Sequence, residues 1–235
     1  MTEHAGHSYQ TIAQRYADRV DSQPIHTHYE RPAVLSLLSS LKGTAVLDVG
    51  CGSGWYTEYF LGQGASVTAF DLNEDFVQLT RQRVGNATRV LQADLSQPLS
   101  FAADRAFDVV VAPLVMHYLK DWQPALSEFH RVLKPQGSLV FSTHYPLVTR
   151  DLFALTDYFE TARITDEWDG IGEVQFYHNS LTQISQALSN SGFVIERLLE
   201  PQPTAEYEQL DPADYQKLST QPWFLVIKAT KRSTV

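Results

Sequence analysis

The sequence predicts one α/β domain spanning residues 1–235, with a mostly parallel sheet and helices on both of its faces. Three observations favour this fold. From residue 44 onward, short β-branched runs alternate with helical stretches, which is the pattern of a parallel sheet built from βα units. One apolar run, 46–49, leads straight into a glycine-rich turn and then a helix. Hydrophobic residues make up 43% of the chain, which is enough for one sizeable core.

The strands are predicted from short runs rich in Val, Leu, Ile and Phe. They cover 44–49, 66–70, 89–93, 107–112, 138–143, 193–200 and 224–230. Helices are expected between them at 55–61, 74–83, 124–133 and 181–191, and before them at 9–20 and 31–41. Residues 1–42 are therefore expected to form an N-terminal helical cap. An excursion over 146–178 and an acidic stretch over 201–222 are expected to be loops that cover a pocket.

Charge and composition narrow the partners of the chain. Acidic residues outnumber basic ones, 27 to 18, and no long Lys/Arg run is present, so nucleic acid is not expected as a partner. No apolar stretch reaches the roughly 18 residues that span a bilayer, and no signal-peptide pattern begins the chain. The single cysteine, Cys51, excludes internal disulfides and Cys-rich metal sites. These features predict a cytoplasmic protein with no membrane partner, and they predict no particular oligomeric state.

The strongest motif is the glycine-rich turn in the run 46–54, Val-Leu-Asp-Val-Gly-Cys-Gly-Ser-Gly. Glycines allow a sharp turn from strand to helix and let a ligand approach the backbone closely. A similar turn seats the pyrophosphate of dinucleotides. Here the spacing is G-x-G-x-G, and Trp55 stands where the dinucleotide motif has its last glycine. An indole at that position disfavours the close helix contact that dinucleotide binding uses.

Two carboxylates follow strands at the same expected sheet edge. Asp71 ends the second predicted strand, where it can accept hydrogen bonds from both hydroxyls of a ribose. Asp94 follows the third, where it can face an adenine amino group. No Lys or Arg occurs from 43 to 80, which suits a cationic nucleoside such as S-adenosylmethionine better than a pyrophosphate. The fourth strand, 107–112, should end beside the first, at the switch point where ligands bind.

These residues resemble those of the class I S-adenosylmethionine-dependent methyltransferases. The similarity rests on the segments 46–54, 107–110 and 131–137 together with Asp71 and Asp94, and it covers about residues 30 to 145. The chain is most similar to the branch of ubiquinone and menaquinone biosynthesis methyltransferases. The resemblance implies a Rossmann-like seven-stranded sheet of order 3-2-1-4-5-7-6 whose last strand is antiparallel. One departure is Gln136, which stands where the family usually has the first of two glycines.

The resemblance also implies which residues bind the cofactor. Gly50 and Gly52 would approach the methionine portion, Asp71 the ribose, and Asp94 with Leu95 the adenine. The full expected set is Tyr16, Asp48, Gly50, Cys51, Gly52, Trp55, Asp71, Leu72, Ala93, Asp94, Leu95 and Ala112. Tyr9 is expected to close over the cofactor with Tyr16, although a spacing of seven also fits a core-facing helical stripe. For Asp48 a structural role in the turn competes with a cofactor contact, and Cys51 fits a small residue in a tight turn.

Methyl transfer is an in-line displacement, so a catalytic base is optional and positioning matters most. His117 and His144, which follow the fourth and fifth strands, are the expected catalytic residues, with Tyr118, Tyr145 and His178 as further candidates. The competing interpretation is that these are hydrogen-bonded structural residues. No metal is expected, because the His26 and His28 pair lacks a third ligand.

The predicted function is therefore methyl transfer to oxygen, nitrogen or carbon of a small molecule. Aromatic residues between 146 and 178, among them Phe153, Tyr158, Phe159, Trp168 and Phe176, suggest a pocket for a partly apolar acceptor. Two alternatives remain. One is a non-catalytic S-adenosylmethionine-binding subunit that regulates or scaffolds a partner. The other is a nicotinamide-dependent oxidoreductase, which the G-x-G-x-G spacing and Trp55 disfavour.

Overall fold

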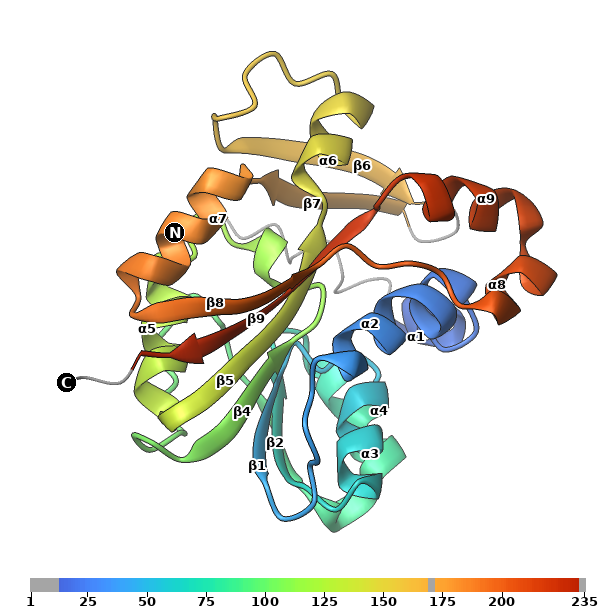
Figure 1. The fold of residues 1–235 in the computed structure, drawn as a ribbon. Coiled ribbons are helices and arrows are strands. Elements are labelled where there is room, and N and C mark those ends of the chain that lie inside the picture. The colour runs from blue at the N-terminus through green and yellow to red at the C-terminus, as the bar shows by residue number, and fades with distance from the viewer. Residues whose placement is uncertain (1–12, 169–171, 233–235) are drawn as a thin grey trace.

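The computed structural model describes residues 13–168 and 172–232 and is built around one central sheet with helices on both faces (Figure 1). Its strands are β1 (Ala45–Val49), β2 (Ser66–Asp71), β3 (Arg89–Gln92), β4 (Phe107–Ala112), β5 (Leu133–His144), β8 (Phe193–Leu199) and β9 (Phe224–Lys231). They lie in the order β3-β2-β1-β4-β5-β9-β8. Strands β1 to β5 pair in parallel, and β9 is antiparallel to both β5 and β8. This confirms the predicted seven-stranded, Rossmann-like order, with β8 and β9 as its sixth and seventh strands.

The helices are α1 (Ala13–Val20), α2 (Arg31–Ser36), α3 (Trp55–Gly62), α4 (Glu74–Val84), α5 (Gln123–Val132), α6 (Pro146–Leu152), α7 (Leu181–Asn190), α8 (Ala205–Leu210) and α9 (Pro212–Thr220), with short helical turns at His26–Glu30, Gly85–Ala87 and Met116–Tyr118. The four helices predicted between the strands, α3, α4, α5 and α7, lie within one residue of their observed bounds. Side-chain caps explain where two of the helices begin. Asn73 accepts a hydrogen bond from Asp75 N at 2.7 Å at the start of α4, and Ser180 forms a capping box with Gln183 at the start of α7.

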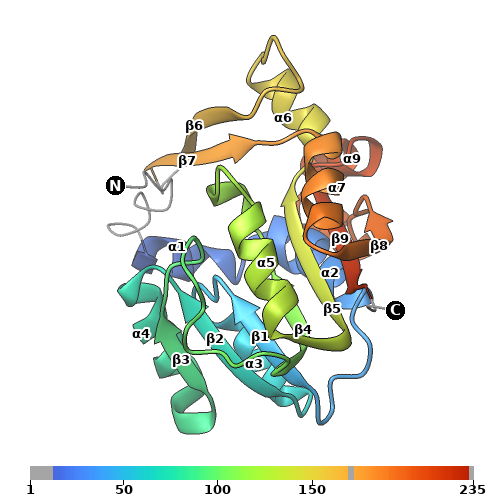
Figure 2. The same cartoon turned by 90° about the vertical axis from the view of Figure 1, so that its left-hand side faces the viewer.

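Two apolar layers follow from the alternation of side chains along the strands. Val46 and Val111 point to the face covered by α2 and α3, whereas their neighbours Leu47 and Val110 point to the face covered by α5 and α7. Figure 2 shows α5 and α7 on the near side of the sheet. Both faces of the parallel strands are therefore buried, and their carboxyl ends are left at one edge, where the glycine turn lies.

The N-terminal segment differs from the prediction. The helix expected over 31–41 ends at Ser36, whose Oγ donates to Ala33 O at 2.7 Å and so competes with the helical hydrogen-bond pattern. A π-helical turn, His26–Glu30, runs directly into it. Tyr9 lies outside the described residues, so its predicted place in the first helix stays a prediction.

The segment 146–178 is more regular than the loops predicted for it. It contains α6 and two antiparallel strands, β6 (Ala162–Trp168) and β7 (Gly172–His178), which form a separate sheet above the carboxyl ends of β4 and β5 (Figure 1). Phe176 of β7 packs edge-on against His144, the last residue of β5, at 4.4 Å between ring centroids. The stretch 201–222 likewise contains α8 and α9.

Strand β5 begins five residues before its predicted start, and Gln136 within it has a φ of +64°. This is the left-handed conformation that glycine adopts without strain, which explains why a glycine would suit position 136. The pairing of β4 with β5 shifts register between Phe107 and Val109, as at a β-bulge. Across the described part of the chain, every helix is too short or too polar to cross a membrane.

Candidate active site

The glycine turn between β1 and α3 presents backbone to a cavity. Gly50 N and Cys51 N donate to Phe70 O at 2.9 and 3.0 Å, which fixes the turn against the end of β2. Gly50 has a φ of +67°, and a Cβ there would come within 2.7 Å of Val115. Gly52 also has a positive φ, of +54°, but a Cβ there would meet no atom within 4 Å. Gly50 is therefore required by packing, whereas Gly52 leaves open space beside its peptide groups.

Asp71 ends β2 with its carboxylate against this turn. Its Oδ2 accepts a hydrogen bond from Gly52 N and its Oδ1 accepts one from Asn73 N, both at 3.0 Å. Burial raises the pKa of Asp71 to about 6, although these backbone donors act to lower it. Each carboxylate oxygen has a further lone pair. Asp71 can therefore accept hydrogen bonds from two ligand hydroxyls while it holds the turn.

The turn and the ends of β2, β3 and β4 enclose a cavity of about 140 Å³, here called the glycine-turn cavity. It is lined by Tyr16, Gly50, Gly52, Phe70, Asp71, Leu72, Asn73, Phe76, Ala93, Asp94, Leu95, Pro113, Leu114, Val115, Tyr118 and Leu119. Asp94 is held in this wall by Ser96 N, which donates to its Oδ1 at 2.8 Å. The cavity thus offers a glycine turn and two carboxylates, and most of its other lining residues are apolar.

A second, larger cavity of about 400 Å³ adjoins the first, here called the histidine cavity. Tyr16, Leu114 and Tyr118 line both. Its remaining lining residues are Arg19, Gln23, Ile25, His26, His117, His144, Val148, Thr149, Leu152, Phe153, Asp166, Glu167, Trp168, Phe176, Trp223 and Phe224. The two cavities therefore meet at the carboxyl end of β4, with three side chains in common.

Known proteins resemble this chain in sequence and in fold. Residues 47–141 match the methyltransferase domain family. An uncharacterised protein of Haemophilus influenzae is 30% identical over 223 residues, which are 86% of this chain and 87% of the relative. A crystal structure from Listeria monocytogenes, assigned to the S-adenosylmethionine-dependent methyltransferases, is 28% identical and superposes with a TM-score of 0.77 over 87% of this chain and 97% of that one. The chain belongs to the class I S-adenosylmethionine-dependent methyltransferases.

A named relative of this methyltransferase is the malonyl-[acyl-carrier protein] O-methyltransferase of Serratia marcescens, which is 37% identical over 111 residues. Those residues are 47% of this chain and 42% of that enzyme. The predicted cofactor and enzyme class are confirmed, and the nicotinamide-dependent alternative has no support. The likeness to the ubiquinone and menaquinone branch stays a prediction.

The groups that line the glycine-turn cavity match the chemistry of S-adenosylmethionine. The open space beside Gly52 admits a ligand against the backbone, and Asp71 has the two oxygens that a ribose needs. Asp94 and Leu95 lie together in the wall at the far strand, where the prediction put the adenine. When bound, the cofactor supplies a methyl group made electrophilic by its sulfonium. Tyr16, Leu72 and Ala93 also line this cavity, in keeping with their predicted contacts.

Two predicted cofactor residues lie elsewhere. Asp48 is fully buried in β1 and lines none of the cavities described here; its Oδ2 accepts a hydrogen bond from Thr57 Oγ1 at 2.5 Å. Burial raises the pKa of Asp48 to about 7. Ala112 is also fully buried and lines none of them. For Asp48 this geometry favours the structural role, because its side chain ties β1 to α3 and so fixes the turn between them.

Cys51 and Trp55 lie on the other side of the glycine turn. They line a third cavity of about 70 Å³, here called the arginine cavity, which is also bounded by Tyr16, Val20, His26, Glu30, Arg31, Gly50, Gly52, Ser53, Tyr56, Pro113 and Leu114. Trp55 stacks on Tyr59 at 5.5 Å and carries the Arg31 guanidinium over its ring at 4.1 Å. Burial raises the pKa of the Cys51 thiol well above its ordinary value, so it is no nucleophile.

The two predicted catalytic histidines come together in the histidine cavity. The rings of His117 and His144 stack at 4.3 Å with 16° between their planes. Burial lowers the pKa of His144 to about 4, and burial together with His144 lowers that of His117 well below its usual range. Neither ring nitrogen of His117 has a hydrogen-bond partner among the described residues. Both imidazoles are therefore neutral at pH 7, and His117 has a lone pair to offer a ligand.

The three further catalytic candidates differ in their positions relative to the cavities. Tyr118 lines both large cavities and contacts the His117 ring at 4.4 Å. Tyr145 is engaged by Glu200, whose hydrogen bond raises the pKa of the phenol to about 12. His178 lies outside the histidine cavity, with its Nε2 2.9 Å from Tyr158 O. Tyr145 and His178 therefore fit the interpretation that they are hydrogen-bonded structural residues.

Sequence reasoning missed several site residues. His26 lines the histidine cavity, and burial followed by the Arg31 charge lowers its pKa to about 4. Leu114 borders all three cavities with a φ of +48°, held by its N–H, which donates to Ser142 O at 3.1 Å and to Ser142 Oγ at 3.0 Å. The Pro113 that precedes it marks a break after β4, but no local pattern signals a left-handed leucine.

Within residues 13–168 and 172–232, no group of three or more His, Cys, Asp or Glu side chains is suited to a metal ion.

Proposed function

We propose that this methyltransferase transfers the methyl group to oxygen, nitrogen or carbon of a small molecule that binds in the histidine cavity. The observation that carries the proposal is the contact between the two large cavities through Tyr16, Leu114 and Tyr118. A methyl donor in one cavity and an acceptor in the other would meet beside these side chains, away from bulk water.

The lining of the histidine cavity supports a planar, partly apolar acceptor. Trp168, Phe176, Trp223 and Phe224 supply aromatic surface. Phe176 stands edge-on to His144, and Phe224 stacks parallel to it at 6.0 Å between ring centroids. Such walls bind flat rings through apolar contact and through the charge distribution of their faces and edges.

The histidine pair supports a role in orienting the acceptor. Because His117 is neutral and its ring nitrogens have no hydrogen-bond partner in the described part of the chain, its acceptor nitrogen can take a hydrogen bond from a hydroxyl or amine of the bound molecule. That bond would point the nucleophilic atom toward the boundary with the glycine-turn cavity. A base of such low pKa is a weak proton acceptor on its own, so positioning is the larger part of the proposed role.

The acceptor named for the relatives, malonyl-[acyl-carrier protein], is a second acceptor to consider for this enzyme. The match to the Serratia marcescens enzyme covers 111 residues, whereas the lining of the histidine cavity extends from Tyr16 to Phe224. A match of that length cannot include both ends of the cavity. The acceptor named for the relative is therefore carried over only as a case to be tested.

The test uses purified enzyme and S-adenosylmethionine labelled in its methyl group. A fractionated extract of small metabolites and malonyl-[acyl-carrier protein] serve as alternative acceptors. The proposal expects label in a small metabolite. Label in the carrier protein alone, or in no acceptor although the cofactor binds, would contradict it.

Substitutions in β7 then test where the identified acceptor binds. Phe176→Ala should raise the KM for the acceptor and leave the Kd for S-adenosylmethionine unchanged, because Phe176 lines only the histidine cavity of the three. Val174→Ala is the matched control, since Val174 is a fully buried residue of the same strand that lines none of them. Equal effects of the two substitutions would contradict binding at this site.

A further inference from the structure

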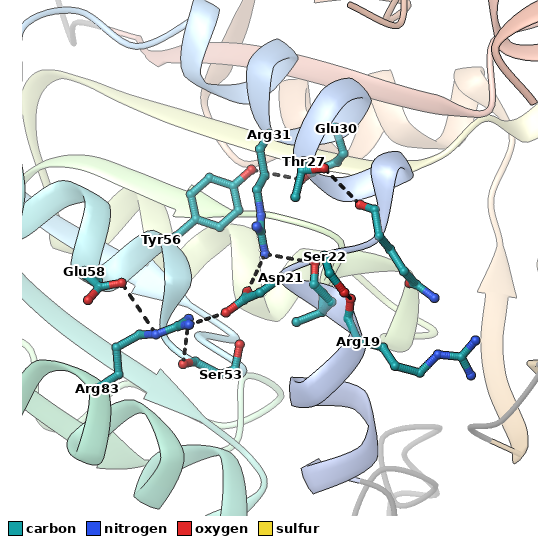
Figure 3. A network of polar contacts seen from close by, with 12 residues as sticks. Arg19, Asp21, Ser22, Thr27, Glu30, Arg31, Ser53, Tyr56, Glu58 and Arg83 are labelled. Carbon is teal, nitrogen blue, oxygen red and sulfur yellow. Dashed lines mark hydrogen bonds and ion pairs between the residues drawn. The ribbon is translucent and has the colours of Figure 1, made fainter. Parts of the chain in front are cut away.

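Three polar nitrogens around the end of β7 are buried without a partner. Trp122 Nε1, His178 Nδ1 and Asn179 Nδ2 have no hydrogen-bond partner among the described residues. Elsewhere polar side chains pair directly, as Arg31 and Asp21 do near the glycine turn (Figure 3). An unpaired buried nitrogen costs free energy, so three of them in one region indicate that a small polar molecule binds there.

The residues that carry these nitrogens line one small cavity, here called the polar cavity. Trp122 is only 4% exposed and His178 only 2%. The polar cavity adjoins the histidine cavity, with which it shares His144 and Thr149. Its volume is about 10 Å³, which is the room that about one water molecule needs.

Neighbouring hydrogen bonds fix the orientation of the Asn179 amide. Ser180 N donates to Gln183 Oε1 at 2.7 Å, so the nitrogen of that amide, Nε2, is the donor to Thr161 Oγ1 at 2.9 Å. Because the Thr161 oxygen accepts there, the hydrogen of its hydroxyl is donated to Asn179 Oδ1 at 3.3 Å. The atom of Asn179 that needs a partner is therefore the Nδ2 donor.

The other two nitrogens are one donor and one acceptor. The indole Nε1 of Trp122 can only donate. His178 Nε2 lies 2.9 Å from Tyr158 O, and a carbonyl oxygen only accepts, so Nε2 carries the hydrogen of the neutral ring. His178 Nδ1 then has a lone pair and accepts.

A second acceptor belongs to the same cavity. Thr149 lines the polar cavity, and its hydroxyl donates to Tyr145 O at 3.2 Å. A hydroxyl oxygen that donates its hydrogen still has lone pairs with which it can accept. Two donors and two acceptors thus border a space for one small molecule.

We propose that the polar cavity binds one water molecule. The water accepts hydrogen bonds from Trp122 Nε1 and Asn179 Nδ2, and it donates to His178 Nδ1 and Thr149 Oγ1. An anion has no hydrogen to give the two acceptors, and the two N–H groups repel a metal cation. Water has the two hydrogens and two lone pairs that this set requires.

The bound water joins the cover of the histidine cavity to the main sheet. Trp122 directly precedes α5, which packs on that sheet, whereas Thr149 lies in α6 and His178 ends β7. Both α6 and β7 also line the histidine cavity, for example through Val148 and Phe176. If the acceptor binds as proposed above, the water holds the wall that carries Phe176 in position against the rest of the site.

The first test is a crystal structure of the intact enzyme at a resolution that shows ordered water. It should contain an oxygen atom within about 3.2 Å of Trp122 Nε1, His178 Nδ1 and Asn179 Nδ2. A map that shows ordered water elsewhere in the interior but no such atom in the polar cavity would overturn the proposal.

The second test measures amide hydrogen exchange in a variant. Trp122→Phe keeps an aromatic ring and removes one donor to the water. Exchange of the β7 amides should become about tenfold faster than in the intact enzyme, as expected for the loss of about one hydrogen bond. The amides of β1, far from the polar cavity in the chain and in the sheet, should keep their rates.

Phe141→Leu is the matched control, because Phe141 packs edge-on against the Trp122 ring at 5.6 Å but does not line the polar cavity. It loosens the packing of the indole and keeps the donor, so the exchange of β7 relative to β1 should stay as in the intact enzyme. Unchanged β7 exchange in a folded Trp122→Phe variant, or equal acceleration in both variants, would overturn the link between the water and β7. Neither test uses an acceptor, so a failure here is distinct from a failure of the proposed function.

Discussion

The imidazole rings of His117 and His144 lie face to face, 4.3 Å apart, in the wall of the histidine cavity. Burial keeps both neutral, so neither repels the other. A stacked pair of neutral imidazoles combines a flat apolar surface with ring nitrogens that can form hydrogen bonds. Its two properties can be removed separately by substitution.

His117→Phe keeps the ring in the stack and removes its nitrogens. Turnover should fall by about a hundredfold if a nitrogen orients or deprotonates the acceptor. The Kd for S-adenosylmethionine, measured by calorimetry, should change less than about twofold, since His117 does not line the glycine-turn cavity. A variant that turns over at the rate of the intact enzyme would remove His117 from the mechanism.

His144→Phe should make the free energy of unfolding less sensitive to acid. The pKa of His144 is about 4 in the folded enzyme and near 6.5 when unfolded. As the pH falls through that window, the unfolded chain binds a proton that the folded chain refuses, so stability is lost by up to about 1.4 kcal/mol per pH unit. The variant lacks this loss. Urea unfolding at several pH values should show its stability rising relative to the intact enzyme below about pH 6.5; a difference that does not vary with pH would contradict the assignment.

Asp71→Asn should weaken cofactor binding by about tenfold or more, because two hydrogen bonds lose their charged acceptor. The pKa of Asp71 is about 6, so the affinity of the intact enzyme should fall as the pH drops through that value, and the variant should not show this step. Asp108→Asn is the control, because Asp108 pairs with Lys134 and Ala45 N at the other end of the strands. It should alter stability and leave the Kd unchanged, and an equal loss of affinity in both variants would count against Asp71.

Gly50→Ala should destabilise the fold by at least about 1 kcal/mol, because the residue is left-handed and its new Cβ would lie 2.7 Å from Val115. Cofactor binding should weaken with it. Gly62→Ala in α3 meets no atom within 4 Å and should leave the free energy of unfolding unchanged or slightly raised. Equal chemical-denaturation midpoints for the two variants would show that the turn tolerates a side chain.

Gln136→Gly should stabilise the enzyme by about 1 kcal/mol, because Gln136 holds a left-handed conformation that costs a side-chain residue free energy. Gln221→Gly is the control, since Gln221 is exposed and extended, with a φ of −142°. Thermal unfolding should give a higher Tm for the first variant only. A lower Tm for Gln136→Gly would mean that contacts of the glutamine outweigh its backbone cost.

The sequence predicted the sheet and most of the glycine-turn cavity because their signals are local. The apolar run 107–112 became β4 with the predicted bounds, and Asp71 ends β2 beside the turn as expected. Asp94 is likewise near its strand in sequence and in space. Such residues are placed by a single βα unit, so strand periodicity and turn chemistry suffice to find them.

Other parts of the site depend on contacts between distant segments. Arg31 meets the glycine turn only through tertiary packing, and nothing in its local sequence distinguishes it from a surface arginine. The side chain of Asp48 was ambiguous because its partner, Thr57, lies in the next helix. The hairpin β6–β7 was predicted as loop because polar and charged residues interrupt its apolar alternation, as in the run 162–168.

Leu114, with its left-handed backbone, lies between the glycine-turn cavity and the histidine cavity. This position has a consequence for redesigning the specificity of the enzyme. Any change at Leu114 or Tyr118 alters the glycine-turn cavity and the histidine cavity together, since both residues line each. Trp168 and Phe176 line the histidine cavity but not the glycine-turn cavity, and they lie on a hairpin separate from the main sheet. With the acceptor bound as proposed, new acceptor preferences are best sought by varying that hairpin, which leaves the lining of the glycine-turn cavity unchanged.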